Sequence, residues 1–178
     1  PVANDLFPSF AELNIDEPQE RGPDGRLSSV EAVYREYLKH KTRPPTIDQS
    51  LRVGKDKGLA DAVIWAVGED IPWSPSAENQ SPVTIQIENA SFVPRATAVI
   101  AGQSVIFENQ DPVDQSVSAT LRVLNPPFNF LLKDRSTESS SRIVFSVPEP
   151  FPARISLQHC PWTSGLLFVH SNPYVAIS

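Results

Sequence analysis

A chain of 178 residues with an apolar share of 40% is long enough for one domain with an extension. Its net charge of −6 and the absence of any basic run exclude nucleic acid as an expected partner, because a phosphate backbone needs a basic surface. No apolar stretch reaches the roughly 20 residues that a membrane span requires.

The first 50 residues predict an arm followed by one helix. Residues 1–27 hold scattered prolines and acidic residues without periodicity, which is typical of an arm or linker. A helix is predicted from Ser28, because Ser28-x-x-Glu31 fits a capping box, and Pro44-Pro45 ends it. Apolar residues recur on one face of this helix at Val30, Val33, Tyr34, Tyr37 and Leu38. We expect that stripe to dock on the rest of the protein.

Residues 51–82 predict a strand pair and a linker. The segments 51–53 and 62–67 have the period of two that is typical of strands, and they flank a turn at Gly54–Gly58. A stretch rich in Pro, Ser and Asn follows over 71–82. We expect this region to pack on the domain formed by residues 83–178.

The remainder, residues 83–178, predicts an all-β domain. Short segments of strand character alternate with Pro and Gly, which favours an antiparallel sandwich over a helical fold. Pro is abundant throughout, with 18 residues against 7 Gly. The expected strands are 83–87, 96–100, 104–108, 116–123, 142–147, 154–157, 166–169 and 174–177.

Four motifs in this domain resemble the cupredoxins. They are Gly102-x-x-Val105-x-Phe107-x-Asn109-x-Asp111, Asn125-Pro126-Pro127-Phe128-Asn129, Pro148-Glu149-Pro150, and Leu157-x-x-Cys160-Pro161-Trp162-Thr163 with Pro173-Tyr174 beyond it. The pattern is similar to that of secreted bacterial plastocyanin-like proteins, often labelled methylamine-utilisation proteins. The resemblance implies a cupredoxin-like Greek-key β-sandwich, in the periplasm or outside the cell. Together with the N-terminal arm and the one short docked helix predicted above, this is the expected all-β fold.

The resemblance also implies where a blue-copper ion would be held. A blue-copper site uses two imidazoles, a thiolate and a weak axial Met. At the four matching positions this chain carries Gln115, Leu157, Cys160 and Thr163, none of which is the residue that the family has there. The sequence therefore predicts a degenerate copper site and no cofactor, in a structural or protein-interaction module whose partner is unknown.

An altered copper set is the alternative interpretation. His159, Cys160 and His170 are the soft or borderline donors near this end of the chain. Pro161 favours an extended backbone at Cys160, so His159 and Cys160 should point to opposite sides. With these ligands the protein would carry copper or transfer electrons. Trp162 either packs over the sandwich or forms an exposed docking patch for a partner.

Catalysis is not expected. Cys160 beside His159 suggests a thiol nucleophile, but sequence neighbours rarely face each other and no third orienting group follows. Asp111 and Asp114 are interpreted as turn formers beside Pro112, and not as an acid and base pair. The chain has no phosphate-binding glycine loop and no H-E-x-x-H or C-x-x-C motif.

Overall fold

The computed structural model describes residues 29–40, 52–68, 71, 81–121, 124–135 and 140–178. The predicted arm over residues 1–27 and most of the predicted linker therefore lie outside the described residues. Ser28, the predicted helix cap, lies outside them as well.

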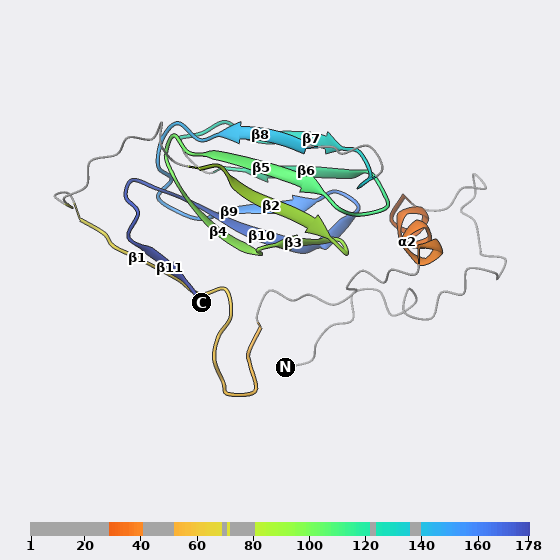
Figure 1. Ribbon diagram of the computed structural model, residues 1–178, viewed down its shortest axis with the longest axis horizontal. Helices are drawn as coiled ribbons and strands as arrows, with labels where there is room; N and C mark the ends of the chain where they lie inside the picture. The colour runs from red at the N-terminus through yellow and green to blue at the C-terminus, as the bar shows by residue number, and fades with distance from the viewer. Residues whose placement is uncertain (1–28, 41–51, 69–70, 72–80, 122–123, 136–139) are drawn as a thin grey trace.

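Two sheets pack into a sandwich (Figure 1). The first has the order β3-β2-β5-β8, with β2 and β5 parallel and the other pairs antiparallel. The second has the order β4-β10-β9-β6-β7, with β4 and β10 parallel. The strand bounds are β2 Val83–Glu88, β3 Ser91–Val93, β4 Ala96–Ile100, β5 Ser104–Asn109, β6 Gln115–Thr120, β7 Phe128–Leu132, β8 Ser140–Val144, β9 Ala153–Leu157 and β10 Cys160–His170.

Buried apolar side chains alternate with more exposed ones along the strands, and the buried ones fill the space between the two sheets. Ile85 and Ile87 of β2 are fully buried, and so are Val105 and Phe107 of β5, because successive side chains in a strand point to opposite faces. The second sheet contributes buried residues such as Ile155. The predicted all-β sandwich with one helix is thus confirmed.

Two strands were not predicted. Ser91–Val93 forms the edge strand β3, and it is too short to show a period before Pro94. Phe128–Leu132 forms β7 and pairs with β6 over its whole length. The sequence shows the start of β7 only as part of the Asn-Pro-Pro-Phe-Asn motif, because Pro126 and Pro127 normally indicate a loop.

The predicted pairing of 51–53 with 62–67 is wrong. β1 (Val63–Trp65) pairs instead with β11 (Val175–Ile177), with Val63 opposite Ile177. Val53 makes an isolated bridge to Leu59, because the turn closes on itself through the Gly54 N–H to Gly58 carbonyl hydrogen bond of 2.8 Å. The division of the chain at residues 50 and 82 stays a prediction.

Helix α2 (Ser29–Lys39) covers one end of the sandwich, beside the connections from β5 to β6 and from β9 to β10 (Figure 1). Its Tyr37 side chain is fully buried and joins the core of the β-sandwich, with Val33 packed against that core. The exposed face carries a Glu36–Lys39 ion pair. The expectation that the helix docks on the β domain is therefore confirmed.

Candidate functional site

The four positions predicted to match copper ligands lie at the end of the second sheet. Gln115 begins β6, Leu157 ends β9, and Cys160 begins β10, three residues before Thr163. Leu157 is the register partner both of Val117, two residues after Gln115, and of Cys160. All four residues are buried. The fold thus brings Gln115 to the same end as three residues that lie more than 40 positions later in the sequence.

Tyr37 of helix α2 enters this same end. Its hydroxyl donates a hydrogen bond to the Asp111 carboxylate and accepts one from the Gln115 side-chain amide. That amide also donates to Asp111 Oδ2, at 3.0 Å. The three side chains therefore form a closed, buried triangle of hydrogen bonds. We call Tyr37, Asp111, Gln115 and the neighbouring Cys160 the buried polar cluster.

Asp111 connects the cluster to a second part of the fold. Its Oδ1 accepts the Asn89 N–H at 2.6 Å, and its Oδ2 accepts the Ala90 N–H at 2.9 Å. Asn89 and Ala90 have φ angles of 52° and 53°, and successive left-handed residues point their N–H groups into one concave anion site. Asn109 Oδ1 in turn accepts the Asp111 N–H at 3.0 Å. Asp111 is therefore more than the turn former that its sequence context suggested.

Burial sets the protonation of the cluster. The pKa of Tyr37 is raised, first by burial and then by the neighbouring Asp111 charge. Burial, with a smaller effect of Asp111, raises the pKa of Cys160 to about 12. Burial also raises the pKa of Asp111, although hydrogen bonds from Tyr37, Ala90, Gln115 and Asn89 act in the opposite direction. At neutral pH the phenol and the thiol therefore keep their protons.

These residues do not fit a blue-copper ion. At the position that the resemblance assigns to the thiolate, Leu157 offers no donor atom. At the position that it assigns to an imidazole, the protonated Cys160 is a poor substitute. Among the described residues, Gln115 Oε1 and Thr163 Oγ1 are buried without a hydrogen-bond partner, but both are hard oxygen atoms. No group of three or more His, Cys, Asp or Glu in the described ranges could hold a metal ion.

The alternative set of His159, Cys160 and His170 is not brought together. His159 lies in the connection between β9 and β10, whereas His170 is the last residue of the 11-residue strand β10. The His170 ring stacks on Phe168 with centroids 5.9 Å apart, and burial lowers its pKa. The side chain of Trp162 lies outside the described residues.

Sequence reasoning missed Tyr37 as a residue of this site. The helix pattern showed that Tyr37 faces inward, but not what it meets. A tyrosine within an apolar stripe is itself a signal, because a buried phenol hydroxyl usually needs a partner. Its buried partners are Asp111, in the connection after β5, and Gln115, the first residue of β6. They lie 74 and 78 residues away, and a single sequence gives no indication of that pairing.

The lone thiol gives a direct prediction. Cys160 is 2% exposed, and its pKa of about 12 leaves almost no thiolate at pH 8. We expect the folded protein to react with a thiol-specific disulfide reagent at least 100-fold more slowly than the urea-unfolded protein. Time-resolved absorbance of the released thiolate measures this rate. A rate equal to that of a free thiol would show that the cluster is open.

No family model and no curated protein matches the chain. Several solved structures are similar in fold at low sequence identity. A copper-containing nitrite reductase from Thermus scotoductus SA-01 matches with a TM-score of 0.46 and 19% identity, over 61% of this chain and 26% of that one. A purple cupredoxin from Nitrosopumilus maritimus matches with a TM-score of 0.41 and 19% sequence identity, over 49% of this chain and 99% of that one. Amicyanin from Paracoccus versutus matches with a TM-score of 0.42 and 14% sequence identity, over 62% of this chain and 99% of that one.

The strand orders β3-β2-β5-β8 and β4-β10-β9-β6-β7 form the Greek-key sandwich that the motifs implied, and the similar structures are cupredoxins. The fold is cupredoxin-like. The prediction that this cupredoxin-like protein has no cofactor is wrong as stated, because the neighbours include copper proteins, among them a Cu(I) form of an amicyanin variant. Within the described residues, no helix has the length and apolar character needed to cross a membrane.

Proposed function

We propose that this protein is a non-catalytic cupredoxin-like module with a structural or protein-interaction role. In this proposal the copper site is degenerate, and the Tyr37 side chain occupies the position of the copper ion. One observation carries this proposal. The Tyr37 hydroxyl hydrogen bonds to both Asp111 and Gln115 at the end of the sandwich where the ligand positions lie.

The cluster joins parts of the fold that are distant in sequence. Through Tyr37 it holds helix α2, through Gln115 it holds the start of β6, and through Asp111 it holds the turn after β2. The two hydrogen bonds of the Tyr37 hydroxyl are buried, and the Asn89 to Asp111 bond is half-buried. Breaking either bond of Tyr37 would leave an unsatisfied polar group in the core. The chemistry of the cluster thus favours a fixed scaffold over a site that exchanges a ligand.

Two further observations support a non-catalytic role, although one structural neighbour is a nitrite reductase. The Cys160 thiol is buried and holds its proton, whereas a nucleophile needs an accessible thiolate. The Asp114 side chain is exposed, and it contacts Lys133 at 2.8 Å and accepts the Asp134 N–H, so its carboxylate is engaged outside the buried polar cluster.

The cellular location of the protein and the existence of a protein partner are inferred from the family resemblance alone. We propose a location in the periplasm or outside the cell, and a protein partner of unknown identity. Fractionation of the source cells, followed by detection of the protein in each fraction, checks the location. Recovery of the folded protein mainly in the cytoplasmic fraction would contradict it.

Titration with Cu(II), and with Cu(I) under reducing conditions, tests the proposed function. We expect no intense thiolate-to-copper absorption band, because Leu157 supplies no thiolate and the Cys160 thiol is buried and keeps its proton. The alternative, an altered copper set that uses Cys160, predicts such a band at one copper per chain and its loss in a Cys160→Ala variant. A band with that dependence on Cys160 would overturn the proposal in favour of copper carriage or electron transfer.

A further inference from the structure

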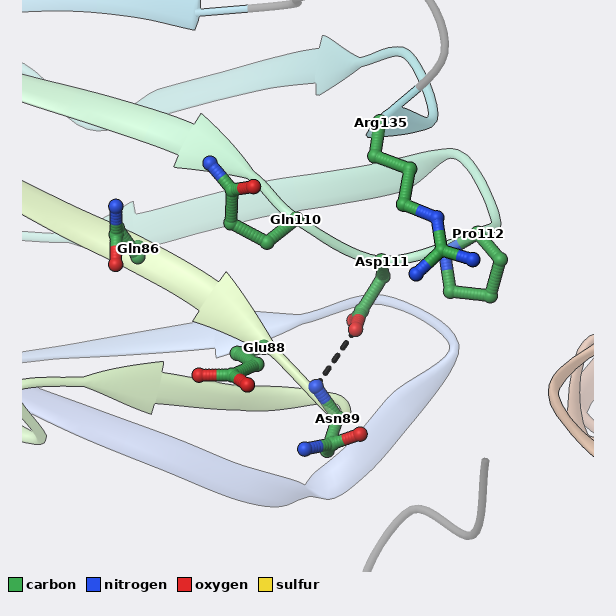
Figure 2. A pocket seen from close by; sticks show the side chains of 7 residues that line it. All are labelled: Gln86, Glu88, Asn89, Gln110, Asp111, Pro112 and Arg135. Atoms are coloured by element: carbon green, nitrogen blue, oxygen red, sulfur yellow. Dashed lines mark hydrogen bonds between the residues drawn. The ribbon is translucent and has the colours of Figure 1, made fainter. Parts of the chain in front are cut away.

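A polar pocket opens on the outer face of the first sheet (Figure 2). Its volume is about 410 Å³, within the range of about 300 to 1,000 Å³ that is common for small-molecule sites. Three side-chain amides line it, those of Gln86, Asn89 and Gln110, together with the charged groups of Glu88 and Arg135. No aromatic side chain is among its lining residues.

Strand geometry explains why these groups meet. In β2 the buried residues Ile85 and Ile87 point inward, so Gln86 and Glu88 point outward. The parallel pairing of β2 with β5 brings Gln110, directly after β5, beside the end of β2, and the Gln110 N–H bonds the Ile87 carbonyl at 2.9 Å.

Arg135 reaches the pocket from the connection after β7. Its backbone N–H donates to the Asp111 carbonyl at 2.9 Å, which ties that connection to the rim of the pocket. Figure 2 shows Arg135 on one side of Asp111 and Glu88 toward β2 on the other. The pocket therefore has a basic side and an acidic side.

Neither charge is neutralised by another residue that the structure describes. Within the described parts of the chain, Glu88 and Arg135 form no ion pair with each other or with another residue. Asp111 also lines the pocket, but its carboxylate already accepts hydrogen bonds from Tyr37, Gln115, Asn89 and Ala90. A ligand would therefore meet a carboxylate and a guanidinium that no other described residue pairs with, together with three side-chain amides.

We propose that this pocket binds a small zwitterion of the short-peptide type. The ammonium group would pair with Glu88 and the carboxylate with Arg135, since a guanidinium can hold a carboxylate with two parallel hydrogen bonds. The Gln86, Asn89 and Gln110 side chains would donate to and accept from the peptide groups, because each amide has both capacities. A simple anion fits less well, because Glu88 repels it. This inference does not depend on the state of the copper positions.

NMR titration of the full chain with glycine, diglycine and triglycine tests the proposal. We expect saturable shifts of the side-chain amide signals of Gln86, Asn89 and Gln110 with at least one of the three zwitterions. Triglycine that is acetylated at its amino end and amidated at its carboxyl end has the same peptide groups without charges, and should produce no saturable shift. Sodium acetate serves as the anion control and should bind at least tenfold more weakly.

Charge reversal sharpens the test. Glu88→Arg alone and Arg135→Glu alone should each weaken zwitterion binding at least tenfold. The double variant should restore it, because the ligand can bind in the reversed direction. Glu88→Gln and Arg135→Gln give milder versions of the same test, and Arg142→Glu on the exposed strand β8 is the matched control. Unchanged affinity in the single variants, or acetate binding as tight as that of the zwitterion, would overturn the proposal.

Discussion

Replacing Tyr37 by Ala is expected to lower the free energy of unfolding by about 3 to 5 kcal/mol, the usual cost of deleting a buried aromatic side chain. Tyr37 is fully buried and belongs to the core of the sandwich although it comes from helix α2. Its loss removes the packing that holds the helix and leaves Asp111 and Gln115 without a shared partner. Urea denaturation followed by tryptophan fluorescence measures the change.

The Tyr37→Phe variant separates the hydroxyl from the ring. It keeps the ring but removes the group that donates to Asp111 and accepts from Gln115, so we expect a loss of about 1 to 3 kcal/mol. Lys39→Ala on the same helix is the control, and its exposed pair with Glu36 should contribute at most about 1 kcal/mol. An unchanged urea midpoint in both Tyr37 variants would mean that the helix does not dock on the sandwich.

The second large effect is expected on copper binding, when the ligands of a blue-copper site are introduced by substitution. The variant Gln115→His, Leu157→Cys, Cys160→His and Thr163→Met installs the ligand set that the family pattern implies. If Tyr37 occupies the place of the ion, these four changes alone should give little blue colour, because the phenol blocks the site. Adding Tyr37→Ala should produce the intense thiolate-to-copper absorption on addition of Cu(II), since ligand geometry is set by the surrounding backbone and packing.

Comparison of the four-change and five-change proteins distinguishes the possibilities. Equal colour in both would show that Tyr37 does not block the copper position. A folded five-change protein without colour would show that the connections after β5 and β9 no longer place the ligands correctly. Circular dichroism and the urea midpoint of each variant establish that it is folded before copper is added.

Much of the sandwich could be predicted because the core strands show their periodicity locally. Ile85 and Ile87 alternate with polar residues, and Val105 and Phe107 do the same. The pairing of Val63–Trp65 with Val175–Ile177 could not be predicted, because it joins segments more than 100 residues apart. Neither segment has a sequence feature that indicates which strand it pairs with. The nearby glycine turn suggested a local hairpin instead.

The candidate site was predictable only in its outline. The motifs indicated that Gln115, Leu157 and Cys160 would lie near one another, and the fold places them at one end. The role of Asp111 was not visible, because its carboxylate binds a left-handed turn at Asn89 and a helix residue at Tyr37. Both partners depend on tertiary structure, and neither Asn89 nor Tyr37 carries a motif.

Tyr37 of helix α2 lies against Gln115 in the interior of the sandwich, and the whole site depends on this contact. The nuclear Overhauser effect between the Tyr37 ring protons and the Gln115 side-chain amide protons measures this contact most directly. We expect clear cross-peaks, together with slow solvent exchange of the Gln115 amide protons, because both groups are fully buried. Absence of these cross-peaks in the folded protein, with rapid exchange of the Gln115 amide protons, would contradict this expectation.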